Sequence, residues 1–241
     1  MNPSSDRENL QDLLEAGRQF ASRETSNHLR GSGTSAEACV DLVASLNRQM
    51  EATIAHATGR EGVPAIACRA GCSFCCHIPV EIAPHEAVAL YDHLQTKLQP
   101  DVKAAVTERL LANRDRISTM TKAEHAATNV QCAFLVDHKC SAYGSRPLAC
   151  ASHHSFDVSP CEESYKHPEI PESEAAPIPK SYMLVCIDSG MKSGVLQALD
   201  AAKLNNETFE LNTAVAALVK DPSSIRRWRS GYWRRLVKIS D

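Results

Sequence analysis

Four cysteines fall within nine residues in the stretch CRAGCSFCC, which spans residues 68–76. Thiolate is the soft ligand that zinc and iron–sulfur clusters select. Cys72 and Cys75 have the C-x-x-C spacing that lets two sulfurs hold one ion or cluster from a tight turn. Gly71 permits the backbone to fold closely around them. The stretch therefore predicts a metal-binding loop, and the rest of the fold must be built around it.

A second set of cysteines lies in turn-rich sequence with little periodicity, from Gln131 to about Pro179. Seven, nine and ten residues separate the neighbours, which is too loose for a zinc knuckle but suits the other half of a shared site. So long an irregular stretch is unusual in a compact domain unless coordination bonds replace hydrophobic contacts. The candidate ligands are Cys68, Cys72, Cys75, Cys76, Cys132, Cys140, Cys150 and Cys161.

Eight thiols suit two four-thiolate sites or two clusters, and equally one site plus several structural thiols. Side chains of neighbouring residues in extended backbone point in opposite directions. Cys75 and Cys76 therefore serve two metals, or one ligates while the other packs. Cys39 on a helical stripe and Cys186 in MLVCIDSG are expected to be core residues, since free cysteine behaves as a small hydrophobe.

Composition predicts an ordinary globular protein, with 43% hydrophobic and 23% charged residues. A formal charge of -3 and an aromatic content of 5% argue against nucleic-acid binding. The amino terminus has no run of signal-peptide length, and no segment approaches the roughly 20 apolar residues of a membrane span. We therefore expect a cytoplasmic protein, in which ten cysteines indicate metal binding rather than disulfides. Its expected partners are a metal ion or cluster and, beyond that, a protein substrate or partner.

Apolar periodicity predicts a mainly α fold: a helical domain with two irregular cysteine-rich metal-binding loops. Alternation of Ile78, Val80 and Ile82 indicates one short extended segment after the first loop. The expected domain division is 1–60 as an N-terminal helical extension, 61–190 as the cysteine-cluster domain, and 191–241 as C-terminal helices packing on the same domain. Helices are expected at about 7–20, 36–57 (capped by Ser35), 84–98, 101–120, 182–203, 207–220 and 222–239.

The two cysteine stretches, CRAGCSFCC and QCAFLVDHKCSAYGSRPLAC, resemble the YkgJ-like cysteine-cluster family, a zinc- or iron-chelating domain with a CxxCxxCC-type signature. The resemblance covers about residues 68–161. This chain has three residues between Cys68 and Cys72 where the signature has two, and Ala151 where an arginine is common. Some members carry a further cysteine at the position of Cys161. The later motif is matched by Cys132, Phe134, Leu135, Cys140, Tyr143, Arg146, Pro147 and Cys150.

The resemblance implies zinc or iron–sulfur binding and makes Cys132, Cys140 and Cys150 ligands. It also implies a possible activity, because flagellin lysine N-methylases belong to this domain family. Cys68, Cys72 and Cys75 have the C-x-x-x-C-x-x-C spacing of radical S-adenosylmethionine enzymes, but those use a βα barrel and this sequence has few strand signals. Three functions remain open: a structural or electron-carrying metal module, an iron–sulfur enzyme that modifies protein lysine, and a zinc- or iron-handling protein.

Several groups near the cysteines have two interpretations each. His153 or His154 completes a metal site, or the two are a surface pair in a polar loop. His77 ligates, or donates a hydrogen bond to a sulfur. Arg146 offsets thiolate charge, or is an exposed turn residue. The basic run of residues 226–238 meets an acidic partner or nucleic acid, or is a solvated helix face.

Overall fold

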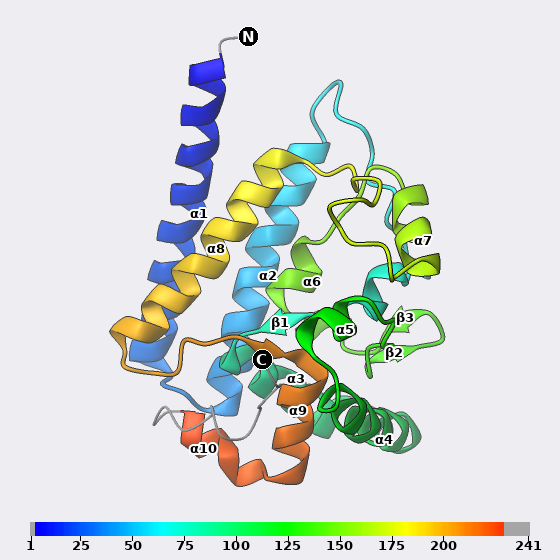
Figure 1. Ribbon diagram of the computed structural model, residues 1–241. Coiled ribbons are helices and arrows are strands. Elements are labelled where there is room, and N and C mark those ends of the chain that lie inside the picture. Colours follow the sequence, from blue (N-terminus) through cyan, green and yellow to red (C-terminus); the bar gives the residue numbers. More distant parts are fainter. Residues whose placement is uncertain (1–2, 229–241) are drawn as a thin grey trace.

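Helices dominate the structure, a computed structural model that describes residues 3–228 (Figure 1). The mainly α prediction is confirmed. In chain order the α-helices are α1 (Pro3–Gly31), α2 (Ala36–Thr58), α3 (Pro84–Thr96), α4 (Pro100–Ile117), α5 (Lys122–Ala126), α6 (Leu148–Ser152), α7 (Ser159–Lys166), α8 (Tyr182–Ala201), α9 (Leu211–Lys220) and α10 (Ile225–Trp228). The 3-10 turns are η1 (Phe74–His77), η2 (Tyr143–Ser145) and η3 (Pro222–Ser224).

The helices α1 and α8 lie side by side along one edge of the molecule, with α2 next to them (Figure 1). Their close approach depends on glycine. A methyl group on Gly190 would overlap the carbonyl oxygen of Leu14, and one on Gly194 would overlap that of Arg18. Backbone therefore packs on backbone at this crossing, and no larger residue fits without separating the helices.

The core lies where α2, α3, α4 and α9 meet. The Ser35 side chain accepts a hydrogen bond from the Ala38 N–H and caps α2, as the sequence predicts. The apolar stripes of α2, α3 and α4 are buried, as expected from their periodicity. The largest fully buried side chains are Phe134, Leu46, Met50, Ile82, Leu90, Leu94, Leu110, Ile117, Leu184 and Met191.

Two short antiparallel pairs fasten the loops to this core. β1 (Glu81–Ile82), which follows the first cysteine segment, pairs with β4 (Phe209–Glu210). β2 (Leu135–Val136) pairs with β3 (Lys139–Cys140) inside the second segment. The first pair explains why α9 begins at Leu211, four residues later than the apolar pattern predicts.

Three expectations about the elements need correction or fall outside the structure. α1 is a helix of 29 residues where the sequence predicted a short one at 7–20, because packing on α8 extends its ordered face. The stretch 131–179 contains α6, α7 and a hairpin, so it is less irregular than predicted. Of the helix expected at 222–239, only η3 and α10 are described, and most of the basic run lies outside the described residues.

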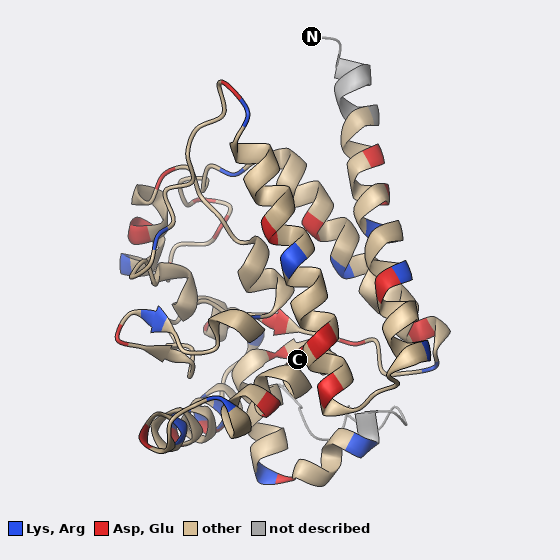
Figure 2. Cartoon of the chain, turned by 180° about the vertical axis from the view of Figure 1, so that it is seen from behind, with Lys and Arg blue, Asp and Glu red and all other residues tan. Residues whose placement is uncertain are grey.

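Acidic and basic residues are interspersed along the helices rather than separated by sign (Figure 2). Within residues 3–228 no helix combines the length and apolar character needed to cross a bilayer.

Candidate metal centre

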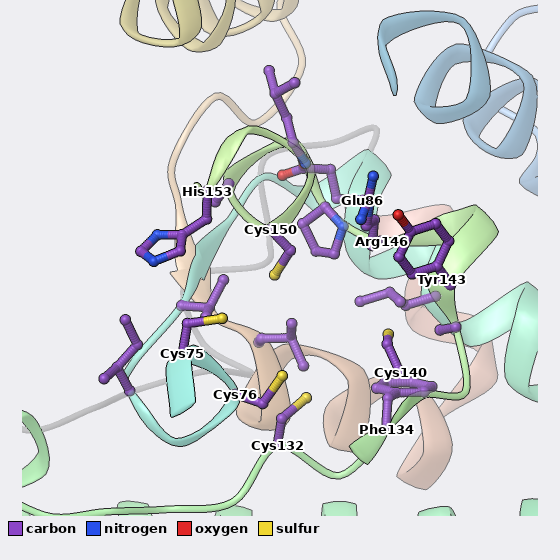
Figure 3. Close-up of a pocket in the computed structure, with 18 of the residues that line it drawn as sticks. Cys75, Cys76, Glu86, Cys132, Phe134, Cys140, Tyr143, Arg146, Cys150 and His153 are labelled. Atoms are coloured by element: carbon purple, nitrogen blue, oxygen red, sulfur yellow. The ribbon is translucent and has the colours of Figure 1, made fainter. Parts of the chain in front are cut away.

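A cavity of about 940 Å³ lies between the two cysteine segments and the helices α2, α3 and α8 (Figure 3). Seven of the eight predicted ligands line it, although the two segments are far apart in sequence. They are Cys68, Cys72, Cys75, Cys76, Cys132, Cys140 and Cys150.

The first segment folds as consecutive tight turns. Gly71 has a φ of 92°, a conformation that suits glycine, and the Cys72 N–H donates to the Arg69 carbonyl oxygen at 2.9 Å. Cys75 and Cys76 lie in η1. Their backbone is 3-10 helical rather than extended, so the two side chains do not point in opposite directions as expected. Instead their thiols form a hydrogen bond.

The second segment runs directly alongside the first. The Cys132 N–H donates to the Cys76 carbonyl oxygen at 2.7 Å, and the Val130 N–H donates to that of His77 at 3.1 Å. The β2–β3 hairpin then brings Cys140 back toward the cavity, paired with Leu135. The helix α6 carries Cys150. The two halves that the sequence predicted to share a site are thus joined by backbone hydrogen bonds.

Cys161 is the one predicted ligand that does not line the cavity. It lies in α7, which packs on η1, and it is partly buried. Its thiol contacts the Ser155 hydroxyl, and the charges of Cys68 and Cys72 act on it. The Ala67 N–H donates to the Ser155 carbonyl oxygen at 2.8 Å, which fixes this part of the second segment beside Cys68. Cys161 therefore lies near Cys68 and Cys72.

Burial favours the protonated form of the most enclosed of these thiols, Cys75, Cys132 and Cys150. Burial, and after it the charges of Cys75 and Cys140, raise the pKa of the Cys150 thiol to about 12. The pKa of Cys132 is raised by burial and by Cys150. The hydrogen bond that the Cys75 thiol donates to the Cys76 sulfur, followed by burial, raises the pKa of Cys75. A cation must displace these protons before the sulfurs act as ligands.

The chemistry of the donor set fits zinc or an iron–sulfur centre, since it consists of thiols with few competing oxygen donors. In the described part of the chain, no three His, Cys, Asp or Glu side chains are already arranged around a metal position. The thiols share one cavity, and the side chains must draw together when metal binds. Sites of this kind are rarely preformed without their ion.

The three histidines near the cysteines occupy different positions around the cavity. His153 lines the cavity, and burial lowers its pKa to about 4. His154 is buried, its Nε2 accepts a hydrogen bond from the Ser181 N–H at 3.0 Å, and its Nδ1 lies 2.9 Å from the Ser152 carbonyl oxygen. The surface-pair interpretation is therefore wrong. His77 lies outside this cavity, with Nδ1 at 3.0 Å from the Ser73 carbonyl oxygen.

Arg146 is not an exposed turn residue, since its side chain is 14% exposed. Its Nη2 donates to the Glu51 carboxylate at 2.8 Å, and its guanidinium lies 3.9 Å from the centre of the Tyr143 ring. Its charge lowers the pKa values of the Cys140 and Cys150 thiols, against the larger effect of burial. The predicted electrostatic role is thus consistent with its position.

The two remaining cysteines differ from each other. Cys39 is 3% exposed in the core, as predicted. Cys186 is only partly buried in α8 and is not among the core residues, so that expectation is wrong. The helix α8, which carries Cys186, approaches α1 most closely at Gly190 and Gly194.

His85 and Glu86, which no sequence pattern singled out, lie on the cavity wall in the first turn of α3. Glu86 accepts hydrogen bonds from the Ala83 N–H at 2.8 Å and the Leu148 N–H at 2.7 Å, so it joins the starts of α3 and α6. Burial raises its pKa. His85 is 2% exposed, and burial lowers its pKa to about 4. A histidine and a glutamate directly after Pro84, at a predicted helix start, were the available signal.

Comparison with protein families gives a match over residues 67–172 to the CxxCxxCC model, described as "putative zinc- or iron-chelating domain". The matched range contains all eight cysteines of the two segments. Searches of curated proteins and of solved structures returned no match.

Proposed function

Because residues 67–172 form a domain of the CxxCxxCC family, we propose that this chain is a metal-binding protein that holds zinc or an iron–sulfur centre through the thiolates of two loops. The observation that carries the proposal is the single cavity lined by seven cysteines from two distant segments. A hydrophobic core would not gather so many thiols around accessible space, since free cysteines that only pack are normally enclosed.

Two groups of thiols are available to hold the metal. Cys75, Cys132, Cys140 and Cys150 influence one another's ionisation and form the inner group. Cys68, Cys72 and Cys161 are nearer the surface and form the outer group. Zinc would supply a structural crosslink between the loops. An iron–sulfur centre would supply electron transfer, or an iron with an open coordination position. The division favours two centres over one, with Cys75 as the inner thiol that also acts on Cys68 and Cys161 of the outer group.

An iron–sulfur enzyme, of the kind that modifies protein lysine, is a second candidate. The size of the cavity favours it, because 940 Å³ is at the upper end of ordinary ligand pockets and far exceeds the space around one ion. A zinc- or iron-handling protein would instead need a labile metal. Exchange of the bound metal with a chelator on a timescale of minutes would favour this third function.

Anaerobic purification without a metal-binding tag tests the proposal, followed by elemental analysis, a labile-sulfide assay and a visible absorption spectrum. Iron with sulfide and a brown colour would indicate a cluster, and stoichiometric zinc in colourless protein would indicate a thiolate zinc site. Cys75→Ser should lower the metal content, while Cys186→Ser, in α8, should leave it unchanged. Wild-type protein that is folded and free of both metals, or Cys75→Ser with full metal content, would contradict the proposal.

A further inference from the structure

The junction of β4 and α9 is hydrogen-bonded to both cysteine segments, although it lies outside the family match, which ends at residue 172. The Leu211 N–H donates to the carbonyl oxygen of Val80 at 2.9 Å, and β4 pairs with β1, which follows the first segment. In the second segment, the Ala133 N–H donates to Oδ1 of Asn212 at 3.0 Å. One short stretch of chain therefore holds both halves of the metal centre.

Asn212 is the middle member of a buried polar relay, formed by Glu210, Asn212 and Asn113. One oxygen of Glu210 accepts from Nδ2 of Asn212 at 2.8 Å, and the other accepts from the N–H and the hydroxyl of Thr213 at 2.7 and 2.8 Å. Oδ1 of Asn212 also accepts from Nδ2 of Asn113, in α4, at 3.1 Å. Glu210 and Asn212 are 2% and 5% exposed, so water does not compete for these bonds. The amide of Asn212 is therefore fixed in one orientation.

The relay fixes the backbone on both sides of Cys132. Nδ2 of Asn113 donates to the carbonyl oxygen of Gln131 at 2.7 Å, while Asn212 accepts from the N–H of Ala133. The N–H of Cys132 itself donates to the first segment, and its carbonyl oxygen accepts a hydrogen bond within the second. The side chain of Cys132 lines the cavity (Figure 3). This thiol is therefore carried by a backbone that is already in place before a metal binds.

We propose that Asn212, together with Glu210 and Asn113, is a positioning residue of the metal centre, which holds Cys132 where the ion needs it. The inference rests on the proposed function and adds to it residues outside the family match. Groups that orient a ligand from behind determine metal affinity, and their loss typically weakens it about 10- to 100-fold. Without the relay, the backbone at Cys132 relaxes in the metal-free chain. Metal binding must then order it again, which weakens the affinity.

The test is the affinity of the full chain for Zn²⁺, measured by competition with a chromophoric chelator. If the purified chain carries a cluster, iron and sulfide per folded chain are compared instead. Asn212→Ala should weaken Zn²⁺ binding at least about tenfold. Asn206→Ala is the matched control, because it removes an exposed hydrogen bond to Asp200, and it should change the affinity less than about twofold. A purely structural residue would lower the free energy of unfolding and leave the affinity of the folded chain unchanged. Wild-type affinity in Asn212→Ala would therefore overturn the inference.

A charge swap keeps the test decisive if Asn212→Ala does not fold. In the double variant Glu210→Gln with Asn212→Asp, the new amide donates to the new carboxylate, which still accepts from the N–H of Ala133 and from Asn113. Its affinity should lie within about threefold of wild type. Asn212→Asp alone sets two carboxylates against each other and should bind at least about tenfold more weakly. A swap no tighter than Asn212→Asp would refute the relay. Failure of the proposed function is distinguishable, because a wild-type chain with neither Zn²⁺ affinity nor iron would show it before any variant is made.

Discussion

The helical part of the chain and its cysteine segments are stabilised by different means. α1 and α8 pack backbone to backbone, and α2, α3, α4 and α9 enclose a continuous apolar core. The cysteine segments have short helices, a two-residue hairpin and thiols that are mostly only partly buried. The helical part is complete without a ligand, whereas the cysteine segments enclose a cavity. Metal coordination must therefore stabilise the cysteine segments, as apolar packing stabilises the helical part.

Metal removal should separate the two regions with the largest effect. Structural zinc contributes on the order of 10 kcal/mol to the folding of small thiolate sites, so chelation should open the cysteine segments. We expect protease cleavage within residues 159–180 to accelerate at least about a hundredfold, while α1 and α8 stay protected. Limited proteolysis with mass-spectrometric mapping, with and without chelator, measures this. Equal protection of both regions after complete metal loss would mean that packing alone holds the cysteine segments.

Substitution at the glycine crossing should have the next largest effect, on the helical region alone. Gly194→Leu places a side chain against the Arg18 carbonyl, and overpacking of this kind costs about 3 kcal/mol. Chemical unfolding should show that loss, with the metal content per folded chain unchanged. Gly31→Ala is the matched control, because a methyl group there meets nothing within 4 Å. If Gly194→Leu also depleted metal, the two regions would be coupled.

Most helices could be predicted from sequence, because apolar residues repeat at helical spacing and Ser35 and Pro84 mark starts. The gathering of cysteines at one site was also predictable in outline. Two features were not. The length of α1 depends on glycines of α8 that lie more than 170 positions away in sequence. The local signal for His85, its place directly after Pro84 at a predicted helix start, does not show whether the side chain is buried, and only the fold places it on the cavity wall.

Acid should lower the free energy of unfolding through His85. Its pKa is about 4 in the folded protein and near 6.5 when exposed, so above pH 6.5 the ring is neutral in both states and carries no penalty. As pH falls from 6.5 to 4, only the unfolded state gains the proton, and roughly 3 kcal/mol of stability is lost. The free energy of unfolding of His85→Leu should therefore fall less over this range. Parallel pH profiles of the two proteins would show that folding does not lower the pKa of His85.

The smallest effect is expected at the start of α2, where it tests whether the helical region is independent of metal. Ser35→Ala removes the hydrogen bond to the Ala38 N–H and should cost about 1 kcal/mol. Because α2 belongs to the core, the cost should be the same in metal-loaded and chelated protein when unfolding is followed by helical circular dichroism. Ser118→Ala, at the exposed end of α4, is a control for serine loss without an N-cap. If the cost vanished on chelation, α2 would already be unfolded without metal, and the helical region would depend on the cysteine segments after all.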